Sequence, residues 1–471
     1  MSKAEIFYKD IGDYISREEK LKIISENQSM LNPVLKMVKV KPNKHGDWIN
    51  KRNSKFDEFI PMESEIKYNT QAHSFFICLS GSIVSNRDAW CYNFSKLELQ
   101  KNIKKTIQYY NEQRKLVVSE KESEPLRDST KGSWSRDWLN HLKNNTIIKE
   151  DENEYRISQY RPFVKCNTYF ADELNQERYQ MPKLFPNENN QNVVICVTGK
   201  SLFSFSTLIS NHITEFGFLN GRNGTTQCFP LYWYEKKEKV QGSLFEKAED
   251  EYTHRDAISD FILDQAKTRY GPSVTREDIF YYVYGILHSP DYRKTFANDL
   301  KKMLPRLPLV EKTADFWAFS EAGRKLADIH LNYEDQKKPD GVTVTGTEKG
   351  VFTVDKMRFG MKKWGDGGKW GDGGKWGEQK KNEIVYNGHI TISNIPPKAY
   401  EYVVNGKSAI EWVMERYAVT IHKESGIKND PNDWAREHEN PRYILDLLLS
   451  VITVSIKTVD IVAGLPKVEW E

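Results

Sequence analysis

Cysteine is scarce in this sequence. The five cysteines, at positions 78, 91, 166, 196 and 228, are scattered along the chain. No two of them form a C-x-x-C pair and no histidine follows at ligand spacing, so we expect no structural zinc site. An odd number of thiols also argues against a disulfide framework. We therefore expect reduced, mostly buried cysteines.

Long apolar runs are also missing. No segment approaches the ~20 residues that a bilayer-spanning helix needs, and the N-terminus lacks a signal-peptide pattern. The formal net charge is only +3 over 471 residues, which is less than a uniformly basic nucleic-acid binder carries. We expect a cytoplasmic protein with no membrane partner, in which any nucleic-acid contact comes from a local surface.

The residues that are present suffice for a folded core. Hydrophobic residues make up 38% of the chain and aromatic residues 12%, and a chain of this length exceeds one simple core. Up to about residue 250, most apolar patterns are typical of strands. Beyond that position, apolar residues recur at the spacing of a helix. We predict an α+β protein, with a strand-rich lobe built on a mixed, largely antiparallel sheet and a separate helical lobe.

Local signals place the expected elements. Ser16 followed by Glu19 predicts the start of a helix, as does Thr275 further on. An Asn405-Gly406 turn is expected to precede a helix at 408–416. Strands are expected at 73–79, 82–84, 155–163, 192–198, 227–234 and 383–395. Other helices are expected at 97–115, 134–144, 256–270, 276–287, 292–304, 317–329 and 442–464.

One segment, Ser85–Ser95 (SNRDAWCYNFS), is rich in side chains that can recognise a ligand. It holds a guanidinium, a carboxylate, two amides and three aromatic rings, the chemistry that reads phosphates and guanine edges. A surface loop with a structural Arg–Asp pair has the same composition. The segment resembles a signature of the C-terminal specificity region of type ISP restriction–modification enzymes.

Further blocks carry the same resemblance and keep the family's order over nearly the whole chain. They are 6–24 (IFYKDIGDYISREEKLKII), 47–61, 160–170, 280–309 and 399–434. The family joins nuclease, helicase-like ATPase, adenine methyltransferase and DNA-recognition parts in one chain. Because the block at 6–24 resembles the end of the methyltransferase part, we expect a piece cut or split from a longer enzyme.

The resemblance implies a division of the chain. Residues 1–68 would be the methyltransferase end and a connector, 69–250 the first part of the DNA target-recognition lobe, and 251–335 a helical spacer. Residues 336–382 would be a linker with GDGGKW repeats, and 383–471 would complete the recognition region. The repeats are interpreted as an expanded loop, with a tryptophan surface that stacks bases as the alternative.

Catalytic motifs are not found. No N/D-P-P-Y/F tetrapeptide of an adenine methyltransferase occurs. Thr198-Gly199-Lys200-Ser201 imitates a phosphate loop, but Val194 stands where its first glycine belongs. We therefore expect no catalytic residue, no metal and no cofactor on this chain. S-adenosylmethionine, ATP and Mg²⁺ are expected only on the missing parts of the family's enzymes.

The leading hypothesis is sequence-specific recognition of double-stranded DNA, which positions it for methylation and cleavage by a methyltransferase and helicase–nuclease part in cis or in trans. The helix at 97–115 has a lysine face, most often merely solvated, that can follow DNA phosphates. The DNA-binding candidates are Asn86, Arg87, Asp88, Tyr160, Arg161, Lys200, Arg222 and Asn223.

Other interpretations of these residues stay open. Arg161 in Tyr-Arg-Pro-Phe also fits a corner that locks the fold, and Arg222-Asn223-Gly224 also fits a plain turn. At the level of the whole protein, the alternatives are a complete DNA-modifying enzyme with an unrecognised active site and an inactive remnant of a split gene.

Overall fold

The computed structural model describes residues 4–11, 16–119, 124–199, 204–219, 226–237, 251–361 and 379–470. They belong to two compact units, Met1–Glu58 and Phe59–Glu471. The second unit includes β3 (Ile60–Pro61), which pairs with β14 (Arg306–Leu307). The division of the chain that the resemblance implies, with its boundary at 68, stays a prediction. The GDGGKW repeats lie outside the described residues.

The first unit contains a two-stranded sheet and one helix. β1 (Ile6–Tyr8) pairs antiparallel with β2 (Val38–Val40), and α1 (Arg17–Asn27) lies between them in sequence. The predicted helix start is confirmed, because Ser16 and Glu19 form a reciprocal capping box. No residue of α1 is buried. The short 3-10 helices of the unit are η1 (Pro33–Leu35) and η2 (Ser54–Glu58).

Two four-stranded sheets form the strand-rich part of the second unit. In the first, β6 (Tyr155–Arg161) and β7 (Val164–Tyr169) form an antiparallel hairpin, with β10 (Ile213–Thr214) parallel to β6 and β5 (Tyr92–Asn93) antiparallel to β7. The second is antiparallel, in the order β4 (Ser80–Gly81), β11 (Thr226–Pro230), β8 (Val194–Thr198) and β9 (Thr207–Ser210). The predicted mixed, largely antiparallel strand arrangement is confirmed.

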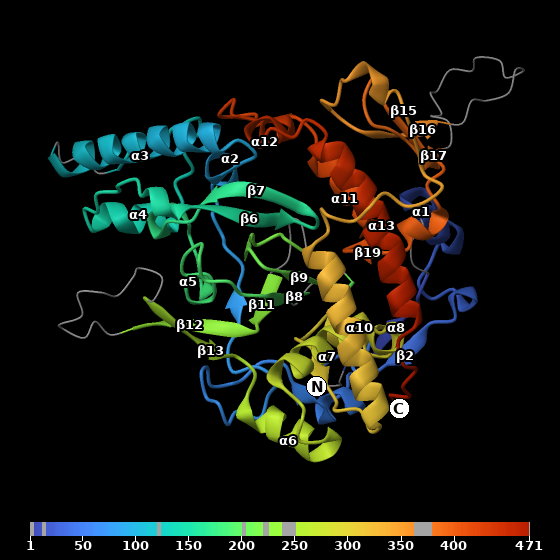
Figure 1. Ribbon diagram of the computed structural model, residues 1–471. Coiled ribbons are helices and arrows are strands. Elements are labelled where there is room, and N and C mark those ends of the chain that lie inside the picture. Colours follow the sequence, from blue (N-terminus) through green and yellow to red (C-terminus); the bar gives the residue numbers. More distant parts are fainter. Residues whose placement is uncertain are drawn as a thin grey trace, which may run out of the picture. The chain divides into compact units, whose positions relative to one another are not determined.

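Helices cover and extend these sheets. α3 (Lys96–Ser119) and α4 (Arg136–Lys143) lie beside each other near the β6–β7 hairpin (Figure 1), after the short α2 (Asp88–Cys91). α5 (Met181–Leu184) precedes β8. The helical part between 260 and 331 comprises α6 (Asp260–Tyr270), α7 (Arg276–His288), α8 (Pro290–Thr295), α9 (Ala297–Leu300) and α10 (Thr313–Leu331).

α7 and α10 pack against each other at very close range. A Cβ added at Gly323 would lie 1.9 Å from the backbone oxygen of Tyr281, and one added at Gly285 would lie 2.2 Å from the backbone oxygen of Phe319. The two glycines therefore allow the backbones of the helices to approach more closely than any larger residue would permit.

Shorter strand pairs and the C-terminal helices complete the second unit. β12 (Tyr232–Lys236) pairs antiparallel with β13 (Tyr252–Asp256). A further sheet has the order β15 (Thr343–Thr345), β18 (Thr391–Ser393), β17 (Gln379–Val385), β16 (Arg358–Met361). Two hairpins follow, β19–β20 (Val403–Val404, Lys407–Ser408) and β21–β22 (Thr420–Ile421, Lys428–Asn429). The last helices are α11 (Ala409–Arg416), α12 (Pro431–Glu437) and α13 (Tyr443–Ala463).

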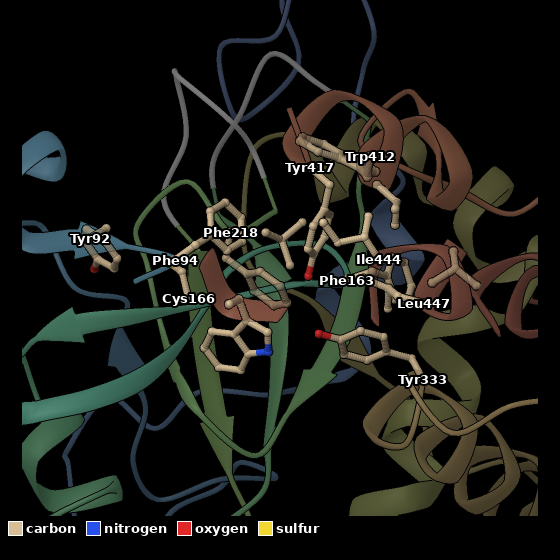
Figure 2. Packing of buried hydrophobic residues seen from close by; sticks show 14 of the residues in the cluster. Tyr92, Phe94, Phe163, Cys166, Phe218, Tyr333, Trp412, Tyr417, Ile444 and Leu447 are labelled. Carbon is tan, nitrogen blue, oxygen red and sulfur yellow. The ribbon is translucent and has the colours of Figure 1, made fainter. Parts of the chain in front are cut away.

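The hydrophobic core joins residues from both ends of the second unit. Figure 2 shows Phe94 and Phe163 of the strand-rich part in one cluster with Trp412 of α11 and Ile444 and Leu447 of α13. All five side chains are buried. The C-terminal helices therefore cover the sheet that begins more than 300 positions earlier in the chain.

Some predicted elements are wrong in detail. Residues 73–79 form no regular strand, although 74–78 are buried, since their amides bond to separate segments, Phe75 to Pro61 and Ile77 to Ala257. The helix predicted at 292–304 breaks at Phe296 into α8 and α9. Residues 227–234 divide between two strands of different sheets, β11 and β12.

Candidate nucleic-acid interface

The Ser85–Ser95 segment folds into a tight turn that leads into α2. Asn86 adopts the left-handed backbone conformation with φ of 53°, which asparagine tolerates better than most residues. The hydroxyl of Ser85 accepts a hydrogen bond from the Arg87 amide at 3.1 Å and donates one to the carboxylate of Asp88. This turn leaves the Asn86 side chain exposed, where it donates to the side-chain oxygen of Gln176.

Arg87 lies inside this turn, with an exposed fraction of 1%. Its guanidinium grips the Asp137 carboxylate with two hydrogen bonds of 2.7 and 3.0 Å. It also donates to the carbonyl of Ser133 at 3.0 Å and the hydroxyl of Ser135 at 2.8 Å, and it lies 4.3 Å from the centre of the Trp138 ring. Arg87 therefore ties α2 to the start of α4.

The charge of Asp137 responds to this contact. Burial alone would raise the pKa of Asp137, but the hydrogen bonds and positive charge of Arg87 hold that pKa below its usual value. Asp137 is thus an anion at neutral pH and the pair is a buried, bidentate ion pair. The hydrogen atoms of the Arg87 guanidinium are directed at these partners, so Arg87 holds the α2 turn against the start of α4.

A second buried pair lies next to the first. Arg161, at the end of β6, forms an ion pair with Glu215, and both side chains are less than a tenth exposed. Burial raises the pKa of Glu215 to about 7, against the opposing charge of Arg161. The hydroxyl of Tyr160 donates to the carboxylate of Asp88 at 3.2 Å, which joins this pair to the α2 turn.

The structure therefore brings five of the predicted residues together, namely Asn86, Arg87, Asp88, Tyr160 and Arg161. Of these five, only Asn86 is fully exposed. Lys200, Arg222 and Asn223 lie outside the described residues. Direct contact of any of the eight with DNA stays a prediction.

Three adjoining hollows run from the α2 turn along α3. The first, of about 610 Å³, is lined by Asn86, Trp90, Arg127 and His422 among others. The second, of about 330 Å³, shares Trp90 with the first. The third, of about 730 Å³, shares residues of α3 and of the β21–β22 hairpin with the second. We call these three hollows the hairpin groove.

The hairpin groove is lined by polar and cationic side chains. Lys101 and Lys105 of α3 border it, as do Arg127, Lys131 and Lys428 from its other walls. Carboxylates also line it, at Glu98, Glu112, Glu424, Asp433 and Glu437. Cations and carboxylates therefore line the groove in nearly equal numbers, in agreement with a net charge of only +3.

On α3, one exposed cation and one buried amide nitrogen that line the hairpin groove have no partner in the described part of the chain. Lys105 is exposed and forms no ion pair with any described residue. Asn102 lines two of the three hollows, and its Nδ2 has no hydrogen-bond partner in the described part of the chain. The helix predicted at 97–115, with its lysine face, corresponds to the wall of the groove that α3 forms.

The sequence interpretation did not assign a role to Asn102, Arg127 or His422. The β21–β22 hairpin lies in the block at 399–434, which carried the family resemblance. This block was the one signal in the sequence that pointed to the hairpin. His422 packs edge-on against Trp90 of α2 with ring centres 5.3 Å apart. Asn93 next to α2 donates to the Lys428 carbonyl at 3.1 Å. These contacts hold the hairpin beside α2.

Other kinds of site were sought in the described residues. There, no three His, Cys, Asp or Glu side chains gather closely enough to bind a metal ion. None of the described helices combines the length and apolar character that a bilayer span requires.

The family model of the type ISP C-terminal specificity domain matches residues 74–447. The chain belongs to this family. The match includes the Ser85–Ser95 segment and confirms the resemblance on which the sequence interpretation rested. The hairpin groove lies wholly within the matched residues of this type ISP specificity domain.

Solved structures resemble the whole type ISP specificity chain. A nuclease-deletion mutant of the type ISP enzyme LlaGI in complex with a DNA substrate mimic is 35% identical, with a TM-score of 0.80 over 99% of this chain and 39% of that one. The ATP-dependent type ISP enzyme LlaBIII bound to DNA is 34% identical, with a TM-score of 0.80 over 99% and 28%. DrdV in its DNA complex is 26% identical, with a TM-score of 0.76 over 98% and 43%.

The chain thus spans less than half the length of each of these three proteins. No curated protein sequence matches it.

Proposed function

We propose that this chain recognises a particular sequence of double-stranded DNA in a type ISP-like restriction–modification system. Methylation and cleavage would be carried out by a methyltransferase and helicase–nuclease part, in the same chain or in another. One observation carries the proposal: 99% of the chain matches a type ISP enzyme whose structure contains a DNA substrate mimic.

The hairpin groove supports a division of roles. Lys101 and Lys105 can neutralise DNA phosphates, the contact that contributes affinity without sequence preference. Asn86 lies on the α2 turn as an exposed amide, and an amide can pair with an adenine edge through two hydrogen bonds. We propose that Asn86 reads a base and that the buried Arg87 holds the turn in place.

Asp88, Tyr160 and Arg161 would support the same turn through their contacts with one another. Lys200, Arg222 and Asn223 stay proposed DNA contacts from the sequence. S-adenosylmethionine, ATP and Mg²⁺ would bind on the methyltransferase and helicase–nuclease parts.

The first unit offers a surface for such a partner. Leu31 is 90% exposed, Met30 70% and Ile24 64%. Clustered apolar exposure of this kind marks interaction surfaces in soluble proteins. We propose that the methyltransferase part of the system covers this surface.

Selection of bound duplexes from a random DNA pool tests the proposal. The full chain is used alone and together with a methyltransferase-bearing type ISP chain that lacks this region, at two salt concentrations. We expect one enriched motif that persists at the higher salt, because base contacts depend less on salt than phosphate contacts do. Equal recovery of all sequences in every arm would refute the proposal.

Asn86→Ala tests the role of the α2 turn, with Asn394→Ala as its matched control. Asn394 is exposed and also has a positive φ, of 62°, but does not line the hairpin groove. We expect Asn86→Ala to reduce the preference for the selected motif about tenfold, the effect of losing ~1–3 kcal/mol of base discrimination. A preference that survives in Asn86→Ala as in Asn394→Ala would exclude base reading by Asn86.

The two other functions open from the sequence have distinct outcomes. Transfer of methyl groups from S-adenosylmethionine to DNA by the isolated chain would indicate a complete enzyme. Failure to bind either DNA or the methyltransferase-bearing chain would indicate an inactive remnant.

A further inference from the structure

A large hollow outside the hairpin groove lies between the strand-rich part and helices α7 and α10. Its volume is about 760 Å³, and it shares no lining residue with the groove. Pockets for small ligands commonly measure about 300–1,000 Å³. β6, β12, the 185–193 loop, the turn at 211–213, α7 and α10 all contribute to its walls.

Arg156 of β6 is the buried cation of this pocket. Its exposed fraction is 8%. The one hydrogen bond that its side chain makes with a described residue is long, 3.4 Å to the carbonyl of Phe185. No described carboxylate forms an ion pair with it, although Glu188 and Asp328 both lie in the pocket wall. A buried guanidinium without a counter-ion is costly, and a bound anion would relieve that cost.

Burial shifts the pKa values of the basic groups in this wall of the pocket. Burial lowers the pKa of Arg156, which the more distant charges of Glu188 and Glu154 only partly oppose. Burial also lowers the pKa of His212 to about 4, and the charges of Lys165 and Arg156 lower it further. His212 is therefore neutral at pH 7, and Arg156 is the cation on this side of the pocket.

Unused amides line another part of the pocket. The side chains of Asn190, Gln191 and Asn211 make no hydrogen bond with any residue in the described ranges. Each amide offers donors and an acceptor, the pairing pattern that matches the edge of a nucleobase. Phe185 and Tyr232 add aromatic surface to the lining, and aromatic rings stack readily on bases.

We propose that this pocket binds a single nucleotide, with its phosphate at Arg156 and its base edge at the amides of Asn190, Gln191 and Asn211. Duplex recognition in the hairpin groove does not require such a pocket, and nucleotide binding in the pocket does not depend on duplex recognition in the groove. The nucleotide can come from solution or from an extrahelical position in DNA, since both present the same phosphate and base.

Isothermal titration calorimetry of the full chain with the four 2′-deoxynucleoside 5′-monophosphates tests the proposal. We expect binding of at least one of them, and weaker binding of the corresponding deoxynucleoside, which lacks the phosphate. Arg156→Gln should weaken the nucleotide about tenfold, as expected for losing ~1.4 kcal/mol.

Arg178→Gln is the matched control. The Arg178 and Arg156 guanidinium groups both lie over the Phe170 ring, 5.2 and 5.9 Å from its centre. Arg178, however, does not line the pocket. Gln191→Ala and Asn211→Ala change exposed residues, so they should fold normally and alter the order of affinities among the four bases. Thermal unfolding checks that each variant is folded.

A duplex with one extrahelical nucleotide, compared with the fully paired duplex, separates the two sources. Tighter binding of the bulged duplex that Arg156→Gln abolishes would assign the pocket to DNA, and binding of the free nucleotides alone would assign it to a soluble ligand. The proposal is overturned if neither ligand binds, or if Arg156→Gln and Arg178→Gln weaken binding equally.

Discussion

Arg87 and Arg161 show how an arginine that looks suited to bind DNA can be used inside the protein. Each forms a buried ion pair, Arg87 with Asp137 and Arg161 with Glu215. A buried pair contributes little net stability compared with apolar residues, but removing one partner leaves an uncompensated buried charge. In this conformation the two pairs connect the segments around the exposed Asn86, and contact of either arginine with DNA stays a prediction.

Replacement of Arg87 by alanine should destabilise the fold strongly. Because Asp137 would stay buried without its partner, we expect the free energy of unfolding to fall by ~3–5 kcal/mol, measured by urea denaturation at pH 7. Arg136→Ala is the control, since Arg136 is adjacent but 69% exposed in its ion pair with Glu177, and such a pair is worth less than ~1 kcal/mol. Losses of similar size in the two variants would contradict a structural role for Arg87.

At the scale of the elements, the predictions that succeeded rest on local chemistry. The helices that begin after Thr275 and Ser408 have the capping boxes that their sequences indicate. Asn405 and Gly406 both have positive φ, 48° and 76°, in the predicted turn. Such signals need only neighbouring residues, so one sequence suffices to read them.

The predictions that failed depend on distant partners. The apolar side of the helix predicted at 97–115 is set by what packs against it, since Leu97 is 61% exposed whereas Leu99 is fully buried. The break at Phe296 lies where its ring packs against Phe59, 5.3 Å away between centres. The hairpin groove is formed by segments about 335 positions apart, as the bond from Asn93 to Lys428 shows. No local pattern encodes such a juxtaposition.

The crossing of α7 and α10 gives a prediction for these two elements. Gly323→Ala places a methyl group against the backbone of Tyr281, so the helices must separate. We expect a loss of ~1–3 kcal/mol in the free energy of unfolding, the usual cost of overpacking. Gly388→Ala is the control, since a Cβ there meets nothing within 4 Å and its φ is not positive. An unchanged midpoint of thermal unfolding for Gly323→Ala would disprove the tight crossing.

For the molecule as a whole, the net charge is close to zero. Removal of a single cation from the hairpin groove should therefore have a measurable effect on DNA binding. Lys105→Ala should weaken binding of every duplex to a similar degree and reduce the slope of log K against log salt by about 1. Lys325→Ala is the control, because Lys325 is exposed on α10 and does not line the groove. Filter binding at several salt concentrations measures both. An unchanged slope for Lys105→Ala would show that DNA phosphates do not contact this part of α3.

The shared core of Figure 2 has a consequence for synthesis of the chain. Phe94 and Phe163 leave the ribosome long before Trp412, Ile444 and Leu447. The nascent sheet must therefore keep apolar side chains uncovered until residues 412–447 have been synthesised. A stop codon shortly before Tyr443 would remove α13 and leave a product that we expect chaperones and proteases to capture.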